Sequence, residues 1–409
     1  MSRLTSWVAS SRPELGTLRR DAVAGIPGAI GSVPDGMASA VLVGVNPVYG
    51  LYASIAGPIG GGLAVSTRLM VVTTTTAAAL AAGSALNGFS GTERPEALFL
   101  LTAVAGVMMI AAGLFRLGRY TRFVSVSVLT GFLTGVAVNI ILGQLADLLG
   151  SPQKGSPAVV KAWNVLTHPG GISLVAAAVG VGALLLIVVL SRTRLASVAS
   201  LVALIVPTLL SLGAGGVVRV ENSGKIPTGI PSPHLPQLSL LSTLQLVAGA
   251  AAVTVIVLVQ GTGVAEAAPN PDGSPSDSNR DFIGQGIGNI AAGMLRGQPV
   301  GGSVGQTALN LAAGARSRWA SIFSGIWLLL ILVVFSGVVG KVPLPTLAAV
   351  LTFAAASSLR VRRIATVLRT GLGSRAAFIA TLGATLFLPV AVAVGIGVAL
   401  SLVLQLSQE

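Results

Sequence analysis

Long apolar segments separated by short polar or basic turns run along almost the whole chain. Leu98–Phe115 is an uninterrupted apolar span, and Val124–Leu149 is long enough for one tilted helix that crosses a membrane. The other apolar segments are Asp21–Val45 (interrupted by Pro27, Pro34 and Asp35), Pro47–Val65, Val71–Leu86, Ile172–Leu190, Leu195–Leu212, Leu240–Ala265, Phe282–Leu295, Trp319–Val339, Pro345–Leu359, Ile364–Leu372 and Ala376–Leu406. The pattern predicts about thirteen or fourteen hydrophobic elements, several of them shorter than the roughly 20 residues of a full membrane span.

One stretch between these segments, Gly297–Arg316, is too polar and too rich in glycine for an ordinary membrane helix. Pro299 and the pair Gly301-Gly302 keep the chain extended, and a helix can begin near Ser303 with that hydroxyl as its N-cap. A helix that begins inside a membrane exposes unpaired N–H groups and the positive end of its dipole, which is tolerated only where the backbone lines a cavity. The stretch therefore predicts either an anion site or, with equal weight, a re-entrant structural loop.

Two short Ala-rich runs occupy similar places in the two halves of the chain. Thr76–Gly83 echoes Thr307–Gly314, and the Pro- and Gly-rich segment Gly213–Gln237 lies between the halves. Paired short segments in corresponding positions point to a transporter site between repeats, although an Ala-rich match also arises by chance. If a half-helix begins at the run Thr73–Thr76, we expect Thr73 or Thr74 to face the site; the alternative is that these hydroxyls bond back onto helical carbonyls.

Composition assigns the chain to the bilayer. Of its 409 residues, 53% are hydrophobic and 9% are charged, and the mean hydropathy is +0.87, whereas soluble domains carry about a quarter charged residues. The net charge of +13 would suggest nucleic acid in a soluble chain, but here the basic residues lie between apolar segments as topology signals, so no nucleic-acid partner is expected. Cysteine is absent, and no paired acid and base or metal-ligand set lies at membrane depth. We therefore predict no enzyme, no catalytic residues, no metal and no cofactor.

The basic residues also predict an orientation. With the N-terminus inside, the richer set of arginines falls on the cytoplasmic side, and the opposite loops are poorer in positive charge. The cytoplasmic set is Arg68, Arg116, Arg119, Arg122, Arg192, Arg194, Arg316, Arg318, Arg360, Arg362 and Arg363, and the opposite set is Lys154, Lys161, Arg219, Lys225 and Lys341. We predict a multi-pass membrane protein with residues 1–20 as a cytoplasmic lead-in.

Ordered motifs recur from the first helix to the Gly-rich stretch. The first helix and the segment after it contain Asp21–Gly25, Val33–Ala38 and Pro47–Tyr52. Further motifs are Ser66–Arg68, Thr130–Gly135, Ile226–Pro231, Asn279–Asn289 and Pro299–Arg316. Together they resemble the SulP family of anion transporters, which comprises the sulfate permeases and their animal relatives, including prestin. The resemblance covers nearly the whole chain.

The resemblance implies an all-α integral membrane protein of about 14 transmembrane segments in two inverted seven-segment repeats, the UraA-like arrangement. These segments would form a core and a gate domain, with half-helices in the third and tenth positions. On this chain the repeats would be 21–213 and 240–409, joined by an extracellular loop at 214–239. Relatives usually carry a C-terminal STAS domain; because the chain ends at Glu409, just past its last predicted helix, we expect that domain to be missing or removed.

The resemblance also implies where the substrate binds, between the N-termini of the third and tenth helices and beside the first and eighth. The matching positions are Asp35, Ser39, Thr73, Thr74, Thr75, Gln260, Ser303, Val304, Gly305 and Gln306. Relatives usually have Gln in place of Asp35 and an acidic residue in place of Gln260, so the carboxylate has moved across the site. Ser39 stands where many relatives have an aromatic residue, and Gln306 replaces a common Arg. These changes would enlarge the pocket and favour a larger anion.

The function expected from these observations is secondary active transport of a small anion by alternating access. Because ionisable groups at membrane depth are functional by default, Asp35 is the predicted proton-coupling group, with a structural hydrogen bond as the alternative. Its protonation would remove a charge that repels the anion, so proton and substrate would load together. The resemblance implies a bacterial inner (cell) membrane and, as candidate substrates, sulfate, bicarbonate, chloride and dicarboxylates; Ser39 favours a dicarboxylate such as fumarate. The alternatives are an anion exchanger and a channel-like pathway for chloride or bicarbonate. A homodimer is possible.

Overall fold

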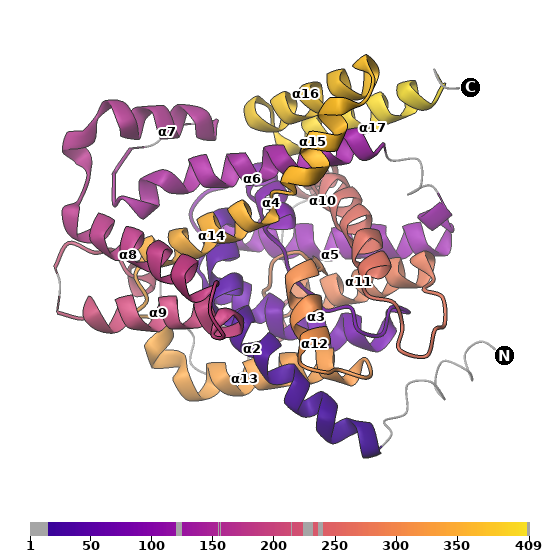
Figure 1. The fold of residues 1–409 in the computed structure, drawn as a ribbon, viewed down its shortest axis with the longest axis horizontal. Helices are drawn as coiled ribbons and strands as arrows, with labels where there is room; N and C mark the ends of the chain where they lie inside the picture. Colours follow the sequence, from indigo (N-terminus) through magenta and orange to yellow (C-terminus); the bar gives the residue numbers. More distant parts are fainter. Residues whose placement is uncertain are drawn as a thin grey trace.

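The computed structural model describes residues 15–119, 125–153, 155, 157–213, 215–223, 232–235 and 240–406. Several predictions lie outside these described residues: most of the lead-in (1–14), Arg122, Lys154, Lys225, the motif Ile226–Pro231, and residues 214, 224–231 and 236–239 of the linking loop. The described chain is helical apart from two short strands and the connecting turns (Figure 1). The all-α class predicted from the sequence is confirmed.

In chain order the elements are α2 (Leu15–Val43), α3 (Val48–Ala64), β1 (Val72–Thr74), α4 (Thr76–Ala85), α5 (Glu93–Leu114), α6 (Val126–Leu148), α7 (Ala158–Thr167), η2 (Pro169–Gly171), α8 (Leu174–Leu190), η3 (Ala196–Val198), α9 (Ala199–Leu210), η4 (Val220–Ser223), α10 (Leu240–Ala267), α11 (Ser278–Met294), β2 (Val300–Gly302), α12 (Val304–Ala312), α13 (Trp319–Val339), α14 (Leu344–Ser358), α15 (Val361–Arg369), α16 (Leu372–Phe387) and α17 (Val390–Leu406).

Four of the described helices, α2, α5, α6 and α10, are long and apolar enough to cross a membrane unaided. Helices α14 and α15 meet the same criterion together, although a bend of 42° separates them. Shorter apolar helices complete the bundle, and large apolar side chains such as Leu174 (83% exposed) and Leu210 (81% exposed) cover its outer surface. An exposed apolar surface of this kind suits a protein that is surrounded by lipid.

The helices pack in two groups, each drawn from both halves of the chain. Helices α2, α3 and α5 pack with α10, α11 and α13, while α6 and α8 pack with α14, and α6 also packs with α16. Figure 1 shows α8 and α9 to one side and α16 and α17 at the top, away from α11 and α3. The grouping has the form of the expected core and gate domains. The inverted repeat and the count of fourteen spans stay predictions.

Two interrupted spans meet in the interior of the first group. Strands β1 and β2 pair antiparallel, with Thr73 opposite Gly301 and Thr74 opposite Val300. Side chains of α11 hold the pair: Asn289 bonds both the N–H and the C=O of Val300, and Gln285 Oε1 accepts from Gly302 N at 3.0 Å. The backbone groups left free by each broken helix therefore find partners inside the protein.

Three predicted elements differ from the structure. Helix α2 continues through Pro27 and Pro34, because its packing against α3 and α13 compensates for the hydrogen bonds that the prolines cannot make. The predicted segment Ala376–Leu406 is two helices, α16 and α17. The break falls where Leu388, which precedes Pro389, takes the extended conformation (φ −112°, ψ 160°) that proline imposes on its neighbour. The predicted third span, Val71–Leu86, begins as strand β1 rather than as helix.

Helices α2 and α3 cross in backbone contact at Gly36 and Gly50. A Cβ atom added at Gly50 would lie 1.8 Å from Gly36 O, and one added at Gly36 would lie 2.9 Å from Ser54 Oγ. Small residues permit this close approach, which is how membrane helices gain packing energy without a hydrophobic effect. The crossing lies one residue from Asp35 and so fixes the position of that carboxylate.

We predict that Gly50→Ala destabilises the protein, because the added methyl group must push α2 and α3 apart. Overpacking of this kind costs about 1–3 kcal/mol or more. The measurement is the midpoint of thermal unfolding in detergent, read by size-exclusion chromatography. Gly182→Ala in α8 is the matched control, since no atom lies within 4 Å of the Cβ that it would add. Equal midpoints for the two variants would contradict the close crossing.

Candidate functional site

A cavity of about 500 Å³ lies between the two groups of helices. One wall comes from α2, α4, α10 and α12, and the other from α6, α14, α15, α16 and α17. Most of the lining is apolar. The polar and charged residues that line it are Asp35, Ser39, Thr74, Thr75, Thr76, Gln260, Ser303, Ser357, Ser358, Arg360, Arg363 and Thr381. Because apolar walls surround a few convergent polar groups, the cavity has the character of a small-molecule site.

Two helix N-termini open into this cavity. Helix α4 follows β1, and Thr75 is its N-cap, with the side-chain oxygen accepting a hydrogen bond from Ala78 N at 3.3 Å. Helix α12 follows β2, and Ser303 Oγ accepts from Gln306 N at 3.4 Å. The prediction of a helix that begins near Ser303 with the hydroxyl as its cap is confirmed. First-turn N–H groups have no partner within their own helix, so both termini offer hydrogen-bond donors and positive dipole ends to one space.

The three threonines before α4 differ in position. Thr74 and Thr75 line the cavity, whereas Thr73 does not belong to the lining. Successive side chains of a strand point to opposite faces, and Thr73 is 1% exposed on the far face of β1. Thr74 Oγ1 shares a hydrogen bond of 3.2 Å with Ser54 Oγ on α3. Of the two hydroxyls expected to face the site, Thr74 does so.

Asp35 projects from α2 into the cavity between the two termini. Its Oδ2 accepts a hydrogen bond from Gln306 Nε2 at 2.9 Å. None of the ion pairs formed by the described residues includes Asp35. Gln306 itself is 3% exposed and outside the cavity lining, and its Oε1 is buried without a hydrogen-bond partner among the described residues. A carboxylate and an amide thus connect α2 to the first turn of α12.

Ser39 forms part of the cavity wall, one helical turn beyond Asp35. It is 1% exposed, and its Oγ donates to Gly36 O at 2.9 Å and accepts from Gln298 Nε2 at 2.5 Å. Its hydroxyl is therefore already satisfied within the protein. Sequence reasoning did not single out Gln298. The available signal was its place in the Gly-rich stretch, two residues before β2.

Gln260 reaches the cavity from α10, as the resemblance implied. The side chain is half-buried, and its Oε1 has no hydrogen-bond partner within the described part of the chain. Val304 and Gly305, the first two residues of α12, also line the cavity and are exposed to it. The cavity therefore brings together eight of the ten predicted site residues, all except Thr73 and Gln306.

The cavity extends beyond the predicted site to one end of the molecule. There it reaches four exposed polar residues of α14 and α15: Ser357, Ser358, Arg360 and Arg363. The sequence predicts only a topological role for the two arginines. The signal that could have identified them is the break between Pro345–Leu359 and the next apolar segment, which turns the chain beside the site. We call this exposed part of the lining, at α15, the mouth of the cavity.

Comparisons with known proteins bear on the family and the fold of the chain. The sulfate permease family model matches residues 18–381. YvdB of Bacillus subtilis (strain 168), named as a candidate sulfate transporter, is 29% identical over 356 residues, which cover 86% of this chain and 66% of YvdB. The sodium-independent sulfate anion transporter of Bos taurus is 26% identical over 375 residues, which cover 82% of this chain and 61% of that protein.

Among solved structures, the transmembrane domain of a cyanobacterium bicarbonate transporter, BicA, superposes with a TM-score of 0.81 at 21% identity. The alignment covers 94% of this chain and 98% of that domain, so the two share a fold. The alignments cover 66% of YvdB, 61% of the Bos taurus protein and 45% of the bicarbonate transporter BicA of Synechocystis, so the chain spans about half to two-thirds of the length of these relatives. Because the family model accounts for most of the sequence, from the start of α2 into α16, the chain belongs to the sulfate permease family.

Proposed function

We propose that this protein is a proton-coupled secondary transporter of a small anion that works by alternating access. Its family is one of membrane anion transporters and not of enzymes. The observation that carries the proposal is the meeting of two capped helix N-termini and Asp35 in one cavity between two helix groups. The membrane is a bacterial inner membrane, in keeping with bacterial relatives such as YvdB.

The two helix N-termini supply the attraction for an anion. Each contributes an effective charge of about +0.5 together with free N–H donors. Apolar walls weaken the screening by water, so these dipoles act more strongly than on a protein surface. Thr75 and Ser303 add hydroxyl donors, and Gln260 adds an amide. Because dipoles rather than fixed cations hold the anion, it can dissociate on the other side of the membrane.

Asp35 supplies the coupling to protons. An ionised carboxylate between the two N-termini would repel the anion, and protonation would remove that repulsion. The Gln306 amide carries both a donor and an acceptor, and its Oε1 has no partner among the described residues. Rotation of the amide would therefore satisfy the carboxyl group in either protonation state. Proton and anion would bind together and leave together.

The substrate candidates are oxyanions and dicarboxylates. One relative is named as a sulfate transporter and one fold neighbour as a bicarbonate transporter. The small Ser39 side chain in the cavity wall would leave room for a longer anion such as fumarate. The second candidate function is anion exchange or a channel-like pathway for chloride or bicarbonate, and it would use the same cavity, whose lining reaches exposed Ser358.

The decisive experiment is uptake of labelled anions into proteoliposomes under an inward proton gradient, with the voltage clamped at zero. For one proton per anion, each pH unit should concentrate the anion about tenfold, since a tenfold ratio corresponds to about 1.4 kcal/mol. Sulfate, bicarbonate and fumarate are compared in turn. Uptake that only equalises the anion concentration would favour the channel, and uptake that requires an internal anion would favour the exchanger.

We predict that Asp35→Asn abolishes the proton-driven accumulation but preserves exchange of internal for external anion, because the neutral amide mimics the protonated carboxyl group. Asp147→Asn is the matched control. This carboxylate lies at the end of α6, outside the cavity lining, in an ion pair with Lys161 at 3.1 Å. If Asp35→Asn vesicles still concentrate the anion under the same gradient, Asp35 is not the coupling group.

We predict that Thr75→Ala and Ser303→Ala each raise the KM for the anion about fivefold, because each removes a cap worth about 1 kcal/mol at a substrate-facing helix end. Ser173→Ala is the control, since Ser173 Oγ caps α8 through Ala176 N at 3.4 Å, away from the cavity. The measurement is initial uptake against anion concentration. A rise of the same size in the control would assign the effect to general helix stability.

We predict that the N-terminus and the α15 end face the cytoplasm. The chain has no cysteine, so labelling of a single introduced thiol shows on which side of the membrane that residue lies. At Gly371, after α15, and at Gly170, after α7, an added side chain meets no atom within 4 Å. In intact cells a membrane-impermeant thiol reagent should label Gly170→Cys and spare Gly371→Cys. The reverse pattern would invert the orientation.

A further inference from the structure

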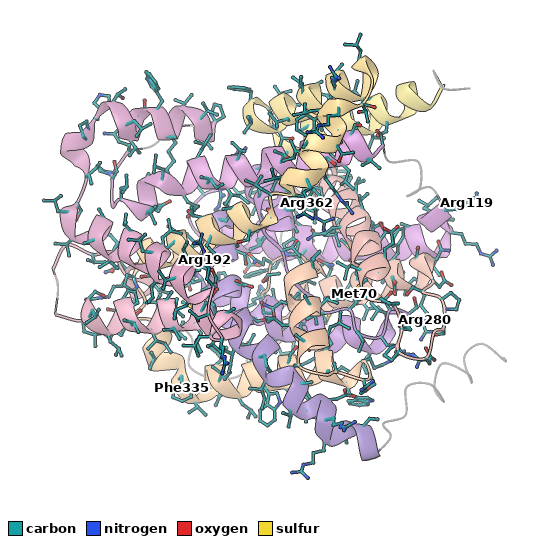
Figure 2. All side chains as sticks on the ribbon, in the orientation of Figure 1. Met70, Arg119, Arg192, Arg280, Phe335 and Arg362 are labelled. Atoms are coloured by element: carbon teal, nitrogen blue, oxygen red, sulfur yellow. The ribbon has the colours of Figure 1, made fainter. Side chains whose placement is uncertain are left out.

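The turn between α14 and α15 directs part of a basic helix into the mouth of the cavity. Leu359 is extended (φ −68°, ψ 106°), and Arg360 follows as the N-cap residue of α15. Arg360 and Arg363 line the cavity. Arg362 and Arg369 belong to the same helix but not to the lining, and Figure 2 marks Arg362 beside the α14–α15 turn. One helix therefore separates its arginines into a cavity-facing pair and an outer pair.

The cavity-facing pair has no partner among the residues that the structure describes. The side chains of Arg360 and Arg363 form no ion pair or hydrogen bond with any other described residue, and both are exposed. Some basic side chains elsewhere in the described chain are paired: Arg68 contacts Asp272 at 2.8 Å, and Lys341 contacts Glu221 at 3.0 Å. Asp35 is the one carboxylate among the described residues that line the cavity. The lining thus holds more positive than negative charge, and the surplus is at the mouth.

We propose that Arg360 and Arg363 form a second anion-binding site, at the mouth of the cavity, that captures the transported anion before it reaches the α4 and α12 N-termini. The proposal rests on the proposed function for its ligand class, a small oxyanion or carboxylate. The guanidinium groups present planar donor pairs that match such anions. Hydroxyls of Ser357 and Ser358, also in the lining, lie on the preceding turn of α14.

The location of the pair indicates its role. Arg360 and Arg363 belong to the α6–α14–α16 group, whereas both half-helices belong to the other group. Movement of one group against the other during transport would change the distance between the two sites. The mouth site therefore raises the local anion concentration on one side of the membrane and does not hold the anion in the occluded state. Charged clefts of this kind raise association rates by about 10-fold to 1,000-fold, and salt screens the effect.

The first test measures the potential at the mouth without requiring transport. Ser358→Cys places the chain's sole thiol in the cavity lining. The rate of its reaction is then measured with an anionic and with a cationic methanethiosulfonate reagent. In the wild-type background the anionic reagent should react faster than the cationic one, relative to their rates with a free thiol. In Arg360→Gln/Arg363→Gln that preference should fall about tenfold. Sulfate, which should compete with the anionic reagent in the wild-type background, should no longer slow the reaction of that reagent with the thiol. The matched control is Arg362→Gln/Arg369→Gln, which removes the same charge from the outer pair and should leave the preference within about twofold of wild type.

The second test is zero-trans transport of labelled sulfate in each direction. Arg360→Gln/Arg363→Gln should raise the KM from the α15 side about fivefold or more. At equal pH on both sides, kcat/KM from the opposite side should fall by the same factor, because transport in the two directions shares one equilibrium. Equal reagent preference and equal KM in the cavity-facing and outer double variants would overturn the mouth site. Loss of the reagent preference in a protein that transports no anion would instead uphold the mouth site and refute the proposed function.

Discussion

The need to satisfy backbone hydrogen bonds away from water is the constraint on which this structure depends. Two spans stop half-way through the helix bundle, and each leaves unpaired N–H and C=O groups that hydrocarbon cannot satisfy. The pairing of β1 with β2 removes most of this penalty, and Ser303 N extends it by donating to Val71 O at 2.9 Å. The groups that remain are the first-turn N–H groups of α4 and α12. They face the cavity, so the unsatisfied donors that destabilise a broken helix are the groups that can bind an anion.

This arrangement requires rigid support on either side of the strands. At one end of β1, the buried carboxylate of Asp281 on α11 accepts from Ser66 N at 2.6 Å, from Thr67 N at 2.9 Å and from Thr67 Oγ1 at 2.5 Å. A carboxylate that accepts several bonds in a buried place holds the loop firmly, because loss of any partner leaves a charge unsatisfied. A similar clamp joins the start of α2 to the turn after α12, where Asp21 Oδ1 accepts from Arg316 N at 2.8 Å. Both half-helices are thus anchored within one group of helices, and their tips keep their mutual orientation if that group moves as a unit.

Sequence reasoning predicted the parts of the site that depend on local chemistry. Pro299, Gly301 and Ser303 predict an extended segment and a capped helix within one short stretch, and the structure has both. Sequence reasoning could not predict features that depend on packing between distant segments. Helix α2 remains helical through two prolines because it packs against α3 and α13. Gln298 is placed by its bond to Ser39, 259 positions earlier in the chain. The orientation of the α15 arginines depends on a bend whose direction no local pattern encodes.

The distribution of charge along the cavity suits transport better than tight binding. Fixed cations close to the half-helices would hold an anion strongly, and the free energy of that binding would have to be overcome at release. Here the centre offers dipoles, hydroxyls and an amide, and Asp35 is its one ionisable group among the described residues. The guanidinium groups are placed at the exposed mouth. Partial charges bind weakly enough for exchange, while full charges in contact with water are screened and act mainly on encounter. Attraction and retention are therefore carried by different residues on different helix groups, so the protein can vary one without changing the other.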